Sequence, residues 1–164
     1  GIYGESTVQI PWNDGELDFD DYEIEEALDA LIGLEYRFPW AVDAKLEYFH
    51  QGSGEQSKHL YRLEDLATGR MSSLGEDNIG FYAERMFSEF YEVSLGGLSN
   101  LNDGSLAGLA EFVWKPRNNL ELATGAILPV GKQYSEFSGE FRLGGDMELD
   151  FVEPFMFCKA RLSF

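Results

Sequence analysis

The feature that most constrains the fold of this chain is an alternation of apolar and polar residues with a period of two. Such a period is typical of β-strands, in which successive side chains point to opposite faces of a sheet. In residues 31–38 one face carries Ile32, Leu34, Tyr36 and Phe38, and the other carries Gly33, Glu35 and Arg37. A short turn at Pro39 follows, and the alternation resumes at Val42, which predicts a hairpin with one apolar and one charged face.

The alternation recurs along the chain and predicts eight strands. They cover residues 2–10, 31–38, 42–49, 79–87, 91–97, 106–115, 120–128 and 156–164. The strand over 79–87 is the least regular, because Arg85 falls on its apolar face and would have to reach toward water. A helix over residues 80–90 is the competing interpretation of that segment.

The connections alternate between short and long. Short turns are expected near Pro39, near Ser88 and over residues 116–119, and longer polar segments cover 13–29, 52–78 and 131–150. A compact turn over 100–105 falls on the side of the long connections. No linker divides the 164 residues, so we expect one domain, or the carboxy-terminal portion of one.

Two kinds of protein have strands with one apolar and one charged face. In a soluble sandwich or barrel the apolar residues point inward, whereas in a transmembrane barrel they face lipid and the polar residues face the interior. Aromatic residues cluster at the predicted strand ends, as in the interfacial girdles of membrane barrels. The polar faces also mix both signs of charge. These features favour an antiparallel up-and-down transmembrane β-barrel with about eight strands in this chain.

The composition excludes several classes of protein. Thirty acidic against twelve basic residues give a net charge of −18, which argues against nucleic acid and against basic binding to an anionic membrane surface. An aromatic content of 15% argues against disorder. The single cysteine, Cys158, excludes an internal disulfide and a cysteine-based zinc site. No apolar run is long enough for a transmembrane helix.

The end of the chain resembles the carboxy-terminal assembly signal of bacterial outer-membrane β-barrels. That signal is a last strand ending in Phe, with apolar residues at every second position before it; its counterparts here are Met156, Cys158, Ala160, Leu162 and Phe164. The family prefers an aromatic residue where this chain has Leu162. Residues 30–38, 88–95 and 101–105 also resemble porin-type barrels. The resemblance implies a location in the outer membrane and, as partners, lipopolysaccharide, the barrel assembly machinery and other copies of the chain.

Two arrangements agree with this resemblance. The chain is either the carboxy-terminal part of a larger porin or a self-contained eight-stranded barrel, and a start at Gly1 rather than Met favours the first. The predicted pore-lining residues are the charges opposite the apolar faces: Glu35, Arg37, Asp43, Lys45, Glu47, Glu92, Glu111, Glu121, Lys159 and Arg161. Acids outnumber bases among them, which predicts a mild preference for cations. The alternative is a closed interior filled by salt bridges.

Other groupings of polar residues carry weaker signals. Nine of the sixteen residues over 14–29 are acidic, and the spacing of Asp14, Glu16, Asp18 and Asp20 resembles a calcium loop. Phe19 stands where that loop needs Gly, so a solvated acidic loop is the favoured interpretation, and a looser calcium or magnesium site is the alternative. Two histidines, His50 and His59, do not by themselves indicate a metal site when no cysteine ligands accompany them. No motif of a catalytic serine elbow occurs.

The sequence therefore predicts an outer-membrane porin or channel for passive diffusion of small hydrophilic solutes, without a cofactor and without enzymatic activity. One alternative is a soluble β-barrel that binds a small apolar ligand. Another is a small closed outer-membrane barrel with a structural or enzymatic role.

Overall fold

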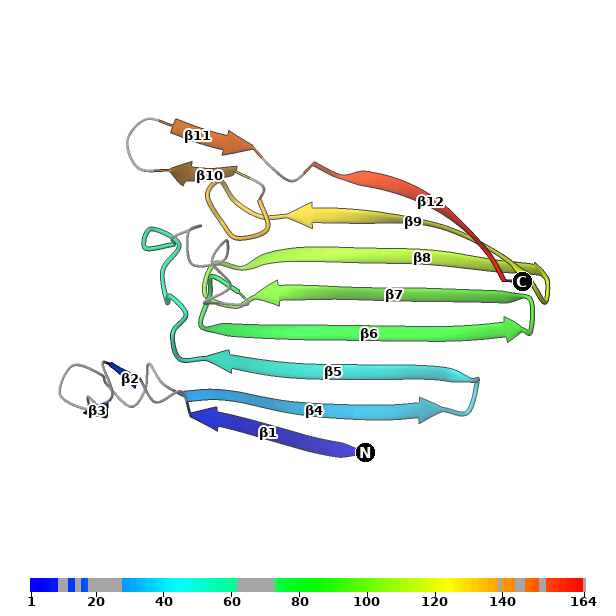
Figure 1. Ribbon diagram of the computed structural model, residues 1–164, viewed down its shortest axis with the longest axis horizontal. Coiled ribbons are helices and arrows are strands. Elements are labelled where there is room, and N and C mark those ends of the chain that lie inside the picture. Colours follow the sequence, from blue (N-terminus) through cyan, green and yellow to red (C-terminus); the bar gives the residue numbers. More distant parts are fainter. Residues whose placement is uncertain are drawn as a thin grey trace.

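The computed structural model describes residues 1–8, 12–13, 16–17, 28–61, 73–138, 140–143, 147–150 and 153–163. One antiparallel sheet of eight strands dominates it (Figure 1). In sheet order the strands are β1 (Ile2–Val8), β4 (Leu28–Phe38), β5 (Val42–Gln51), β6 (Asp77–Ser88), β7 (Tyr91–Asn100), β8 (Ser105–Arg117), β9 (Leu120–Val130) and β12 (Phe155–Leu162). Two small hairpins accompany the sheet: β2 (Trp12–Asn13) with β3 (Glu16–Leu17), and β10 (Glu140–Leu143) with β11 (Met147–Asp150).

The prediction of eight antiparallel, up-and-down strands is confirmed. Residues 79–87 lie within β6, which pairs with β5 on one side and β7 on the other, so the competing helix over 80–90 is wrong. Arg85 does fall on the apolar side, where its register partners are Val42 and Val93. Its guanidinium lies over the ring of Phe87, 4.6 Å from the ring centroid, which accommodates the charge close to a short turn.

The predicted turn over residues 116–119 is shorter in the structure. Strand β8 continues to Arg117 with a register shift after Trp114, so only Asn118 and Asn119 separate it from β9. A bulge absorbs the extra residues, which the alternating pattern alone does not reveal.

The register makes the two faces of the sheet continuous from one edge to the other. Directly paired residues of an antiparallel sheet share a face, and one transverse row on the apolar face consists of Leu34, Leu46, Phe81, Gly97, Gly108 and Leu128. We call this side the apolar face and the opposite side the charged face. Every strand contributes to both.

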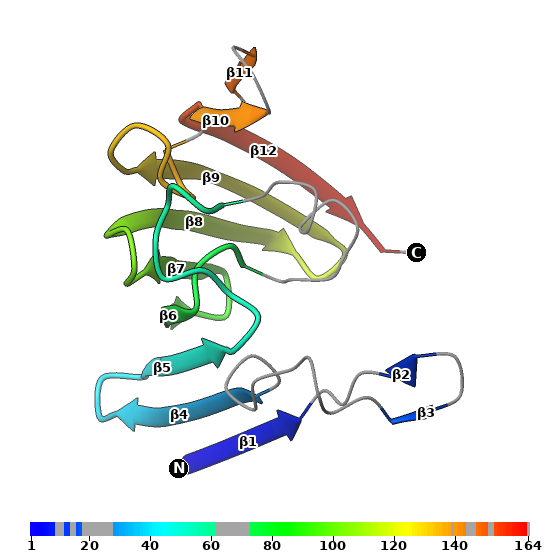
Figure 2. The same ribbon diagram turned by 90° about the vertical axis from the view of Figure 1, so that its left-hand side faces the viewer.

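The sheet is bowed and open. Viewed along its strands it forms an arc, with β1 and β12 at the two ends and the described segments of the loop between β5 and β6 on the hollow side (Figure 2). No pairing joins β1 to β12 in the described part of the chain. The fold is therefore all-β and up-and-down, with two free edges.

Aromatic rings lie across glycines of the neighbouring strand. Tyr3 covers its register partner Gly33, and Phe157 covers its partner Gly125. A Cβ atom added at Gly125 would lie 2.5 Å from the Phe157 ring, so these positions need a residue without a side chain. Such pairs let the strands approach closely and twist.

Candidate functional site

All ten charged residues predicted to line a pore lie on the charged face. Strand β4 carries Glu35 and Arg37, which pair in register with Lys45 and Asp43 of β5. Following the register through the sheet places the remaining six on the same side: Glu47, Glu92, Glu111, Glu121, Lys159 and Arg161. The structure thus brings together on one surface residues that are far apart in the sequence.

Each of the four basic residues in this set forms an ion pair. Arg37 donates two hydrogen bonds of 2.6 Å to the two carboxylate oxygens of Asp43. The Lys45 ammonium lies 2.9 Å from Glu47, which also accepts a 2.7 Å hydrogen bond from the Tyr3 hydroxyl. At the other edge of the sheet the pairs are Lys159 with Glu111, at 2.7 Å, and Arg161 with Glu121, at 3.9 Å.

Further charged residues belong to this surface and were not among the ten predicted: Glu5, Asp29, Glu84 and Lys115. Lys115 lies 3.3 Å from Glu92 and neutralises it. Glu84 is the register partner of Asp43 and accepts a 2.9 Å hydrogen bond from the Tyr82 hydroxyl. The alternation already places Lys115 opposite the apolar residues of its strand, whereas Glu84 lies on the strand whose alternation Arg85 interrupts. Within the described residues Glu35 has no ion-pair partner, so the charged face keeps an excess of acid.

The apolar face is exposed over its whole middle. Half of Leu46 is accessible, and similar fractions apply to other aliphatic residues of this face: Ile32, Leu34, Leu95 and Leu128. Aromatic side chains gather at the short-turn end, where the exposed residues are Tyr36, Phe38, Trp40, Phe87, Phe90, Tyr91, Phe112 and Trp114. A continuous apolar surface of this kind marks contact with a membrane, a ligand or another protein.

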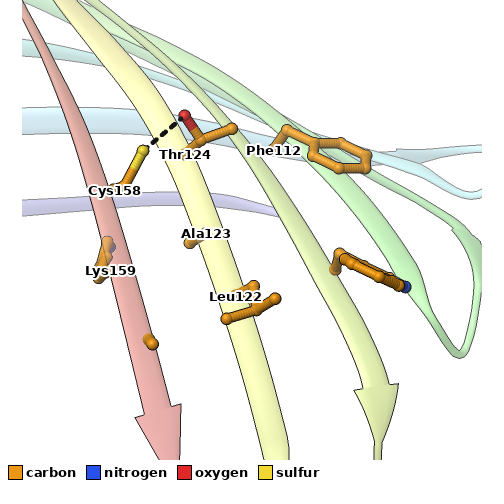
Figure 3. A pocket seen from close by; sticks show the side chains of 8 residues that line it. Phe112, Leu122, Ala123, Thr124, Cys158 and Lys159 are labelled. Atoms are coloured by element: carbon orange, nitrogen blue, oxygen red, sulfur yellow. Dashed lines mark hydrogen bonds between the residues drawn. The ribbon is translucent and has the colours of Figure 1, made fainter.

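A groove of about 410 Å³ lies on the apolar face, where β8, β9 and β12 meet (Figure 3). Phe112 and Trp114 form one side, and small side chains of β9 and β12, including Thr124 and Cys158, leave the space open. Four residues of the predicted assembly signal, Met156, Cys158, Ala160 and Leu162, occupy this face of β12. The fifth, Phe164, lies outside the described residues.

Polar groups are buried at the end of the charged face where the long loops begin. Asn78, Asn100 and Ser105 have no exposed surface, and Glu136 is 7% exposed. The sequence analysis singled out none of these four as functional. Polar residues in loops and at strand ends are common in any sequence, and these four differ only in being buried and hydrogen-bonded.

The predicted metal ligands are not tested. Asp14, Asp18 and Asp20 lie outside the described residues, and the side chain of Glu16 in β3 is not described. Over the described ranges, no group of three or more His, Cys, Asp or Glu residues could hold a metal ion. His50 instead contacts Asp77, with 2.9 Å between its Nδ1 and a carboxylate oxygen.

Comparison with known proteins gives no relative. No family model matches the chain, and no curated protein or solved structure is significantly similar to it. In the described part of the chain, no helix has the length and apolar character needed to cross a bilayer.

Proposed function

We propose that this sheet is part of the wall of an outer-membrane β-barrel, and that its charged face lines a channel for passive diffusion of small hydrophilic solutes. The observation that carries the proposal is the division of the faces. The described loop segments lie on the hollow side of the arc (Figure 2), and they are hydrogen-bonded to Gln51, Asn100 and Ser105 of the charged face. The charged face therefore lines the hollow side, and the apolar face lies on the outer side. A soluble barrel that binds an apolar ligand needs the opposite curvature.

The dimensions and side chains of the outer side support a lipid contact. Strands β4, β6 and β8 have 11, 12 and 13 residues, enough for a tilted strand to cross the hydrocarbon core. Aliphatic residues occupy the middle of the apolar face, and aromatic residues occupy its short-turn end. This is the order expected from the bilayer core to the interface. The polar hydroxyl of Tyr48, at the opposite end, donates a hydrogen bond to Asp77.

The charged face would act on solutes through its fixed charges. Paired acids and bases keep the surface hydrated without a large net field, because each base is compensated by a neighbouring carboxylate. The unpaired Glu35 and the hydroxyl-bonded Glu84 leave a modest negative potential. Such a surface favours small cations and neutral polar solutes over anions.

The open edges bear on the size of the barrel. An arc that is far from closing supports a barrel with additional strands over a closed eight-stranded one, whose interior would be filled by side chains. We also propose three partners for the chain: lipopolysaccharide, the barrel assembly machinery and other copies of the chain itself.

Two measurements test the proposed function. The purified chain should require detergent, and after insertion into planar bilayers it should produce discrete conductance steps in potassium chloride. A chain that stays monodisperse without detergent would rule out the membrane location. Folded, membrane-inserted protein without conductance would instead favour a structural or enzymatic barrel.

A further inference from the structure

The described loop segments at the long-loop end form a single layer over the charged face. Glu55 of the loop after β5 donates its backbone N–H to the carbonyl of Leu74, with 2.9 Å between the atoms. Lys58 donates a 2.7 Å hydrogen bond to the carbonyl of Gln133 in the loop after β9. Two connections that leave opposite parts of the sheet are thereby joined to each other. We call residues 52–61, 73–76 and 131–138 the loop layer.

One carboxylate fastens this layer to the sheet. Glu136 accepts hydrogen bonds from the Ser73 hydroxyl at 2.9 and 3.0 Å and from the backbone N–H of Leu74 at 2.9 Å. It also accepts a 2.7 Å hydrogen bond from the amide nitrogen of Asn100, at the end of β7. The side chain of one loop residue thus holds the other loop and a strand at once.

Asn100, at the end of β7, connects the Glu136 carboxylate to the sheet. Besides Glu136, its amide nitrogen donates to the Tyr61 hydroxyl at 2.7 Å, and its oxygen accepts from the backbone of Asn102 at 2.8 Å. Asp103, in the same turn, accepts a 2.7 Å hydrogen bond from the backbone N–H of Glu136. Burial, together with the nearby Asp103 carboxylate, raises the pKa of Tyr61, so its hydroxyl stays neutral. The backbone and side chain of Glu136 are therefore both attached to the sheet.

The charge of Glu136 makes these bonds strong. Hydrogen bonds to an ionised acceptor are roughly twice as strong as neutral ones. Across the described residues, no Lys, Arg or His forms an ion pair with Glu136, so neutral donors alone compensate its burial. Loss of any one donor leaves a buried charge undersolvated, which makes the layer rigid and intolerant of partial opening.

We propose that this Glu136-centred cluster fixes the loop layer as the constriction at the long-loop mouth of the channel, and so sets the largest solute that passes. The inference rests on the proposed function. The layer lies on the hollow side of the sheet, over the end of the charged face that carries the buried Asn78, Asn100 and Ser105, while the ion pairs of that face lie nearer the short turns. Glu136 is a positioning residue: it acts on solutes through the loops it holds.

The test is Glu136→Gln in the full chain, which in either orientation of the amide puts its NH₂ against a donor, the amide of Asn100 or the backbone N–H of Leu74. We expect larger, noisier single-channel conductance and a shift of the liposome-swelling limit toward larger sugars. Hydrogen exchange at the Leu74 amide should accelerate by about tenfold to a hundredfold, because a charge-assisted bond is lost. Glu89→Gln, beside the short turn after β6, removes the same charge far from the loops and should change none of the three.

A swap separates the cluster from general instability. Combining Glu136→Gln with Asn100→Asp reverses the direction of the central hydrogen bond and keeps the net charge, so conductance, sugar limit and exchange should return toward wild type. Ser73→Ala, which removes one donor, keeps the proposal testable if Glu136→Gln does not fold, and should give a smaller shift in the same direction. If Glu136→Gln, or folded Ser73→Ala, keeps the wild-type conductance and sugar limit, the proposal that the cluster fixes a constriction is wrong. Absence of channels in the wild-type protein would instead overturn the proposed function, and Leu74 exchange would still report the cluster.

Discussion

Substituting Leu46 with Lys separates a lipid-facing sheet from a water-facing one. Leu46 lies in the middle of β5, between Leu34 and Phe81 on the apolar face, and half of its surface is accessible. If lipid covers this face, the substitution places an ammonium group near the centre of the hydrocarbon. If water covers it, the ammonium is fully hydrated.

The two environments predict different losses of folding free energy. A lysine at the bilayer midplane destabilises a barrel by about 2–4 kcal/mol. Since 1.4 kcal/mol is a factor of ten, the folding equilibrium constant should fall roughly 30-fold to 1000-fold. A substitution on a water-exposed surface usually changes stability by less than about 0.5 kcal/mol.

Val130→Lys is the matched control. Val130 is the last residue of β9, lies on the same face and is 59% exposed. Close to the membrane interface a lysine costs only about 0–1 kcal/mol. Both variants introduce one positive charge in place of an exposed aliphatic residue, so they differ chiefly in depth.

The assay is denaturant unfolding of the chain in phospholipid vesicles, followed by tryptophan fluorescence. Trp40 and Trp114 are exposed at the short-turn end and report on contact with lipid. The expected result is a lower unfolding free energy for Leu46→Lys than for Val130→Lys, by at least about 1 kcal/mol. Equal losses in the two variants would refute the placement of Leu46 in the hydrocarbon.

Three other substitutions test separate parts of the structure. Gly125→Ala forces a methyl group against an aromatic ring and should destabilise the sheet by about 1–3 kcal/mol, whereas Gly108→Ala has its nearest contact at 3.7 Å and should change stability little in the same titration. Glu111→Lys with Glu121→Lys should shift the zero-current potential in a salt gradient toward lower cation selectivity; an unchanged potential would place both outside the ion path. Deletion of Phe164 should reduce the heat-modifiable, membrane-inserted fraction on gels, and normal insertion would contradict the assembly-signal interpretation.

The strands and their faces could be predicted because the alternation is strong. In β4 and β5 the charges of residues 35–37 and 43–47 alternate strictly with apolar residues, and a slip of one residue would put a charge on the apolar side. Strand β6 was less certain, because Arg85 breaks the alternation. What resolves β6 is its pairing with two neighbours, a long-range property that a local pattern does not contain.

The ion pairs could be predicted only as a group. Alternation assigns Glu111 and Lys159 to one face, but their distance depends on the register of β8, β9 and β12 and on side chains that reach across a strand. The Glu136 cluster was beyond the sequence for another reason. Ser73, Asn100 and Glu136 are far apart in the chain, and residues of these types are usually solvated in loops.

Alternation alone does not tell which face of the sheet the loops cover, and the structure answers that question for the described loop segments. The long loops carry backbone groups that need hydrogen-bond partners wherever they are buried. Strand residues on the charged face supply them: Asn100 and Gln51 bond the loops directly, and Ser105 accepts from the backbone N–H of Phe137. The aliphatic middle of the apolar face offers no such partners. The described loop segments thus find side-chain partners on the charged side, and the aliphatic middle of the apolar face suits a covering that makes no demand for hydrogen bonds, which is what the proposed contact with lipid hydrocarbon requires.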